Sequence, residues 1–279
     1  MTRRTAAALA VTATVALLLG GCSGDDQPEK PKPSASPSST AASPTPAVAA
    51  PARPRMRACY LLDYSEAVAP TVDVASVPCA RRHTSKTFAV GALDTVVGGH
   101  LLAVDSARVR DQVAQTCPKR FAAFVGGSRE DRRLSMLRPV WFTPTVEESD
   151  AGASWYRCDA VALAADERLA PLTGRLEGLL DRAEDRDRFA MCGTAAPGKP
   201  DFERVICSAD HTWRAVATVP FEEGRYPGVA KVRAAGKDPC QDAGADAAGG
   251  DLDYTWGYEW PTADQWRAGQ TYGLCWAPD

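Results

Sequence analysis

The chain has 279 residues, with 32 Lys and Arg against 35 Asp and Glu, which gives a formal net charge of −3 at pH 7. This balance argues against a nucleic-acid-binding protein, which usually carries a basic stripe. It also argues against purely electrostatic attachment to anionic lipid.

The first 21 residues have the pattern of a secretory signal peptide. Arg3 and Arg4 form a basic start, and an apolar stretch rich in Ala, Val and Leu follows. This stretch has the length of a signal-peptide core and is too short for a comfortable membrane span. Cleavage after residue 21 would remove two Arg and no acid, so the formal charge would change from −3 to −5.

Cys22 follows this stretch directly. Leu19-Gly20-Gly21-Cys22 resembles the lipobox of bacterial lipoproteins, and the resemblance implies a diacylglyceryl thioether on Cys22. The alternative is an ordinary signal peptide followed by an incidental cysteine. Because no later segment holds about 18 uninterrupted apolar residues, we expect lipid to be the anchor, on the extracytoplasmic face of the cell membrane.

Residues 22–56 are expected to form a disordered tether behind the lipidated cysteine. Eight of the 21 prolines lie between positions 28 and 54, interleaved with Ser, Ala and Thr. Such a segment cannot bury enough apolar surface to offset its ordering entropy. It would act as an extended spacer, partly in polyproline II conformation, that carries the folded part away from the lipid.

Eight cysteines remain once Cys22 is assigned to lipid. An even count in an exported chain predicts a disulfide framework, and the sequence has no C-x-x-C motif. Each half holds four cysteines, which allows three pairings if the halves are self-contained. We favour first with second and third with fourth: Cys59–Cys79, Cys117–Cys158, Cys192–Cys207 and Cys240–Cys275.

Two patterns occur once in each half, in the same order. V-x-C-x-x-x-H-T spans residues 77–84 and 205–212, and P-T-x6-G-x5-C spans residues 144–158 and 261–275. Their recurrence indicates two copies of one domain. We place the copies at 57–165 and 188–279, joined by a connector over 166–187.

Each copy is expected to be an α+β domain with a small antiparallel sheet and one main helix. Strands are predicted after the histidines, at 84–90 and 213–219, and near the last cysteines, at 155–158 and 271–276. Alternation along the first strand would place four side chains on one face: His83, Ser85, Thr87 and Ala89.

The main helix is clearer in the first copy than in the second. Apolar side chains there recur at helical spacing, with Cys117 on the buried face: Val109, Val113, Cys117, Phe121 and Phe124. The counterpart near Val229 and Val232 is interrupted by Asp238-Pro239. In the connector, four leucines suggest a short helix that Pro171 and Gly174 oppose: Leu172, Leu176, Leu179 and Leu180.

His83 and His211 are the most suggestive single residues, because each follows a cysteine by four positions. Imidazole serves as a metal ligand or general base, but a structural histidine packed beside a disulfide is the simpler interpretation. A metal site needs three or four convergent ligands. Since the cysteines are expected to be oxidised, we expect neither metal nor cofactor.

Tryptophans are concentrated in the second copy. They would either line a groove for a sugar or a partner, or fill the core of a small domain. The candidate binding aromatics are Trp213, Trp256, Trp260, Trp266 and Trp276.

Familiar catalytic signatures are missing from the sequence, including G-x-S-x-G, H-E-x-x-H and Walker A. The acidic run at 147–150 is explained better by a solvated loop than by acid–base chemistry. We therefore expect a protein without catalytic residues. The alternative is an extracytoplasmic hydrolase or metal-dependent enzyme that uses His83 or His211.

The combination of V-x-C-x-x-x-H, a following strand and a closing W-x-x-G-x5-C resembles the septum-formation-related domain of actinobacterial envelope proteins. The second copy matches best, with Trp266 and Gly269 before Cys275, whereas Ser149 replaces the tryptophan in the first copy. The resemblance implies a non-enzymatic envelope lipoprotein with a role in septation or envelope biogenesis. Its partner would be an envelope protein or the cell wall.

Overall fold

The computed structural model describes residues 51–279. The predicted signal peptide, Cys22 and the tether as far as residue 50 lie outside the described residues. Within residues 51–279, no helix has the length and apolar character needed to cross a membrane. Helices and antiparallel sheets both occur, so the predicted α+β class is confirmed.

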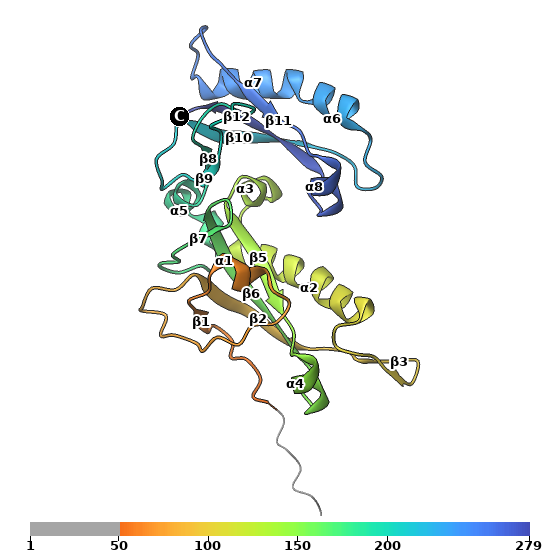
Figure 1. Cartoon of the computed structure of the whole chain (residues 1–279). Helices are drawn as coiled ribbons and strands as arrows, with labels where there is room; N and C mark the ends of the chain where they lie inside the picture. Colours follow the sequence, from red (N-terminus) through yellow and green to blue (C-terminus); the bar gives the residue numbers. More distant parts are fainter. Residues whose placement is uncertain (1–50) are drawn as a thin grey trace, which may run out of the picture. The chain divides into compact units, whose positions relative to one another are not determined.

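The first sheet has the strand order β1-β2-β6-β5, with β7 paired to β6, and every pairing is antiparallel. Its strands are β1 (Cys59–Tyr60), β2 (Ser85–Ala92), β5 (Leu137–Phe142), β6 (Trp155–Ala165) and β7 (Arg168–Ala170). Helix α2 (Ala107–Val125) contacts β2, β5 and β6 and covers one face of this sheet (Figure 1). It buries Val109, Val113, Cys117 and Phe121 of the predicted apolar stripe, whereas Phe124 is half-buried and Val125 is buried in addition.

The second sheet has the order β11-β12-β10-β8-β9 and is also antiparallel. Its strands are β8 (Met191–Gly193), β9 (Arg204–Ile206), β10 (Trp213–Pro220), β11 (Gly257–Glu259) and β12 (Tyr272–Pro278). Helix α7 (Lys237–Ala247) contacts β10, β11 and β12, as α2 contacts the first sheet (Figure 1).

The two sheets place the repeated sequence patterns at equivalent positions. Cys59 pairs with Val77 in one sheet, and Cys192 pairs with Val205 in the other. Strands β2 and β10 each carry an irregularity in register, between Thr87 and Ala89 and between Ala215 and Ala217. The P-T-x6-G pattern also forms the same structure in both halves, because its threonine caps the N-terminus of a short helix.

The capped helices are α4 (Val146–Asp150) and α8 (Ala263–Arg267). Thr145 and Thr262 accept a hydrogen bond from the third helical backbone N–H, which satisfies a donor that the first turn leaves free. Gly152 and Gly269 follow with φ of 96° and 94°, a conformation that favours glycine. The acidic run at 147–150 is therefore helical, and its interpretation as a loop was wrong.

The other elements are short. They are α1 (Tyr64–Val68), β3 (Val96–Val97), β4 (His100–Leu101), α3 (Arg129–Arg133), the 3-10 helix η1 (Leu179–Asp181), α5 (Ala183–Arg188) and α6 (Val229–Ala235).

Four disulfides join the cysteines in the pairing that the sequence favoured. They are Cys59–Cys79, Cys117–Cys158, Cys192–Cys207 and Cys240–Cys275. Each lies within one half of the chain. Two of the disulfides attach the main helices to the sheets: Cys117 of α2 to Cys158 of β6, and Cys240 of α7 to Cys275 of β12. All four of these cysteines are buried.

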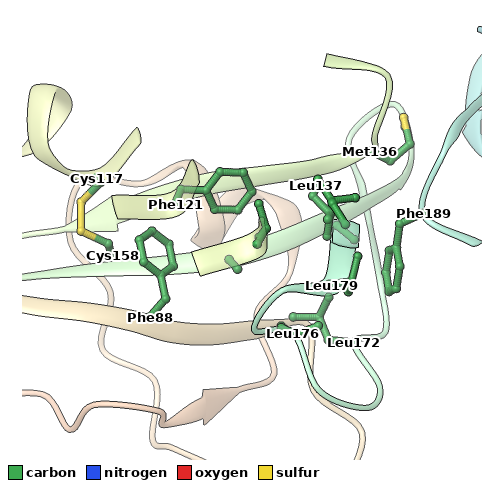
Figure 2. Packing of buried hydrophobic residues seen from close by; sticks show 14 of the residues in the cluster. Phe88, Cys117, Phe121, Met136, Leu137, Cys158, Leu172, Leu176, Leu179 and Phe189 are labelled. Atoms are coloured by element: carbon green, nitrogen blue, oxygen red, sulfur yellow. A yellow bond between two sulfur atoms is a disulfide. The ribbon is translucent and has the colours of Figure 1, made fainter. Parts of the chain in front are cut away.

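The largest core cluster contains residues from both halves and from the connector. Figure 2 shows the Cys117–Cys158 disulfide beside Phe88 and Phe121, with Leu137, Leu176 and Phe189 in the same cluster. Backbone hydrogen bonds join the halves as well, because Met136 N–H donates to the Phe189 carbonyl at 2.8 Å. The two sheets thus share a core.

Two further sequence expectations need correction. Ala89 lies in the same core cluster as Phe88, because the irregularity in β2 interrupts the alternation of faces. Pro239 does not interrupt a helix but lies in the first turn of α7, where its missing N–H has no helical acceptor to lose. The helix boundary is at Gly236 instead.

The connector leucines do not form one helix. Leu172 makes a β-bridge with His83, and only Leu179 and Leu180 lie in the short helix η1. Gly174 has φ of 75°, which turns the chain between these segments. All four leucines are nevertheless buried, so their apolar character reflects the shared core.

Candidate functional site

The two motif histidines make the same local contact. Nδ1 of His83 lies 2.8 Å from the Arg81 carbonyl oxygen, and Nδ1 of His211 lies 2.7 Å from the Ala209 carbonyl oxygen. Each ring thus donates to the backbone two residues earlier and closes the loop that follows a cysteine. His83 is 4% exposed, so its ring is part of the packed interior. The shared contact fixes the orientation of both rings.

His211 has a further partner in Asp279. Its Nε2 lies 2.9 Å from Oδ2 of Asp279, and Nε of Arg214 donates to the same oxygen at 2.6 Å. Burial by itself would raise the pKa of Asp279, but hydrogen bonds from Arg214 and His211 outweigh it and hold this pKa below its usual 3.8. The carboxylate is therefore ionised at neutral pH and orients Nε2 of His211.

The Cys192–Cys207 disulfide lies beside this pair. The two sulfurs and a ring nitrogen of His211 all lie within 4.8 Å of one another, and Sγ of Cys192 is 3.9 Å from Oδ2 of Asp279. A disulfide sulfur is a poor metal ligand, because the thiolate is the species that binds. In the oxidised chain the disulfide therefore serves to hold the loop between Cys192 and Cys207 closed.

Most of the candidate binding tryptophans contribute to the interior. Trp276 is fully buried and Trp266 is 7% exposed, with its indole N–H donating to the Gly224 carbonyl at 2.6 Å. Trp213 packs against the main core and Trp256 against the Cys240–Cys275 cluster. Trp260 is half-buried, and the Arg233 guanidinium lies 5.0 Å from its ring centre.

A groove in the first half is a better binding surface. It is lined by residues 101–104, Val146 and residues 152–154, with Thr95, Ser149 and Asp150 at its sides, and its volume is about 410 Å³. We call it the hairpin groove, because Leu101 of the β3–β4 hairpin lines it. Single exposed apolar side chains are common, but several around one groove indicate a contact surface.

Two exposed apolar side chains line the hairpin groove, and a third pairs with one of them across the hairpin. Leu101 is 80% exposed, its cross-strand partner Val96 is 55% exposed, and Val146 of α4 is 44% exposed. Gly98 and Gly99 join the strands with φ of 60° and 81°, as a tight type I′ hairpin requires. The hairpin therefore holds an apolar pair on a short, well-defined turn.

The family model for septum formation matches residues 58–275. The chain belongs to the septum formation family. The resemblance that the motifs indicated is confirmed by this match. No curated protein and no solved structure matches the chain.

The span matched to the septum formation family contains all eight disulfide cysteines and the hairpin groove. Asp279 lies beyond it. Sequence reasoning missed Asp279, because its partner His211 is 68 positions away and no local pattern joins them. The hairpin did have a local signal, since Gly98-Gly99 stands between apolar residues.

Proposed function

We propose that this member of the septum formation family is a non-enzymatic envelope lipoprotein that binds a protein partner at the division septum. In this proposal Cys22 carries the lipid on the extracytoplasmic face, residues 22–56 span the distance from the membrane, and the two related halves are copies of one stapled domain. The family match supports the septal role. The lipobox-like sequence supports the anchor.

The observation that carries the binding role is the exposed apolar pair of the hairpin, Val96 and Leu101, beside the groove and Val146. Covering such side chains on association removes apolar surface from water, at about 25 cal/mol per Å². The proposal favours a protein partner over a glycan strand, because four of the five candidate tryptophans pack into the interior. The partner would present an apolar segment to the groove.

The test uses a fluorescently tagged full-length chain in dividing cells. The wild-type protein is expected to be enriched at septa, whereas the Val96→Ser/Leu101→Ser variant should remain on the membrane and lose that enrichment. Leu252→Ser is the matched control, because Leu252 is 96% exposed and lies far along the chain from the groove. Wild-type protein spread evenly over the membrane would contradict the septal role, and a double variant that stays enriched would contradict the groove.

A further inference from the structure

The second half contains a set of side chains that could bind a metal ion if the disulfide between two of them were reduced. Sγ of Cys192, Sγ of Cys207 and a ring nitrogen of His211 converge within 4.8 Å, and Oδ2 of Asp279 lies 2.9 Å from Nε2 of His211. Two sulfurs, one imidazole and one carboxylate form a complete donor set for tetrahedral Zn²⁺. We propose that reduction of Cys192–Cys207 converts this corner of the protein into a Zn²⁺ site.

The geometry fits a tetrahedral ion once the S–S bond is broken. Ligand atoms around tetrahedral Zn²⁺ are separated by roughly 3.3–3.8 Å, as bond lengths of 2.0–2.3 Å require. Two thiolates released from a disulfide can separate to that distance, and the ring nitrogen, within 4.8 Å of both sulfurs, needs to approach by about 1 Å at most. The Asp279 carboxylate already lies beside Cys192 and His211 and has to move toward Cys207 to complete the tetrahedron. The ring is already oriented, because Nδ1 of His211 donates to the Ala209 carbonyl at 2.7 Å and leaves Nε2 as the ligating atom.

The reducing step is an exchange with a dithiol. One thiolate of the dithiol attacks Sγ of Cys207, because Cys207 is half-buried and Cys192 fully buried, and Cys192 leaves as the thiolate. The second dithiol sulfur then closes a ring and releases Cys207. The protein gains two electrons and two protons, and the dithiol becomes a disulfide. Binding of Zn²⁺ subsequently displaces both thiol protons.

The first half provides a control within the same molecule. Among the described residues, Cys59, Cys79 and His83 do not converge as a ligand set. Asp279 follows Cys275 by four positions, and Ala162 follows Cys158 by the same spacing, so the fourth ligand is missing there. Reduction of Cys59–Cys79 should therefore create no site. The proposal thus predicts one site per chain.

The experiment compares two full-length variants after mild reduction with a small dithiol and removal of the dithiol without oxygen. Cys59→Ser/Cys79→Ser keeps the proposed site, and Cys192→Ser/Cys207→Ser keeps the first-half residues. Co²⁺ is the probe, because tetrahedral thiolate ligation gives it a strong visible absorption. We expect the first variant to bind about one Co²⁺ per chain, which Zn²⁺ displaces, and the second to show no such band.

Two single substitutions test the ligands in the reduced wild-type chain. Asp279→Asn and His211→Ala should each weaken Co²⁺ binding by at least about tenfold. Asp279 is exposed and directly follows the last residue of β12, so its substitution leaves the fold intact and remains informative if a serine variant unfolds. Absence of the band, equal bands in both serine variants, or unchanged affinity in both single variants would overturn the proposal.

Discussion

The Ser85 hydroxyl donates a hydrogen bond to the Asp159 carboxylate at 2.7 Å, across the neighbouring strands β2 and β6, and both residues are fully buried. Thr87 donates to the other carboxylate oxygen at 2.8 Å, and Nε of Arg157 lies 3.1 Å from Oδ2. Burial raises the pKa of Asp159 against the opposing effect of these neighbours. Because Cys158 faces α2, this polar group lies on the other face of the sheet.

Removing the Asp159 carboxylate should destabilise the protein strongly. Asp159→Ala leaves the guanidinium of Arg157 buried without its anion, and breaking a buried pair in this way costs about 3–5 kcal/mol. Chemical denaturation would measure the loss. Arg157→Leu/Asp159→Leu removes both charges, as Leu274 and Trp276 do at the equivalent positions of β12, and should cost less than the single substitution. A single variant within about 1 kcal/mol of wild type would disprove the pairing.

The Asp279 contacts should make a small contribution to stability that depends on pH. The folded pKa of Asp279 is lowered, so the contribution is fully present above the unfolded value of 3.8 and is lost as the pH falls through the lower folded value. The melting temperature of Asp279→Asn should therefore be lower than that of wild type at neutral pH, and the difference should shrink in acid. The difference should stay at or below about 1 kcal/mol, because the pair is partly exposed to solvent. A gap that widens in acid would contradict the assignment.

Cutting the connector should leave the two halves associated but not covalently joined. A protease site placed in the exposed turn at residues 173–175 lies between segments that pack into the shared core. Without reductant, the cut chains should elute together on a sizing column and separate on a denaturing gel. Fragments that stay joined on that gel until reductant is added would show disulfides between the halves. Fragments that separate under native conditions would contradict the shared core.

The membrane anchor is predicted from Cys22 alone. Cys22→Ala should leave the precursor unprocessed or release the protein from the membrane fraction, because no described helix can span a bilayer. Fractionation of cells, with wild type alongside, measures this. A variant that is cleaved and still sediments with membrane would show that another anchor exists.

The sequence predicted elements whose signals are local. The spacing of Val109, Val113 and Cys117 placed α2 correctly, and the recurrence of cysteines within each half led to the four disulfides. The leucines from Leu172 to Leu180 led to a wrong helix prediction. They are apolar because they pack into a core formed with strands distant in sequence, and not because the segment is helical. Asp159 and Asp279 were not singled out, since the hydroxyl partners of Asp159 lie 72 to 74 positions away and the side-chain partners of Asp279 lie 65 to 68 positions away.

The central claim, that the hairpin groove holds a septal protein partner, is tested most directly by site-specific photocrosslinking in dividing cells. A photoreactive amino acid replaces Leu101, which lines the groove, or Leu252, which is similarly exposed but lies elsewhere in the chain. We expect position 101 to yield a discrete adduct with an envelope protein of the division site, and position 252 to yield none. Absence of an adduct at position 101, or the same adducts at both positions, would contradict the account.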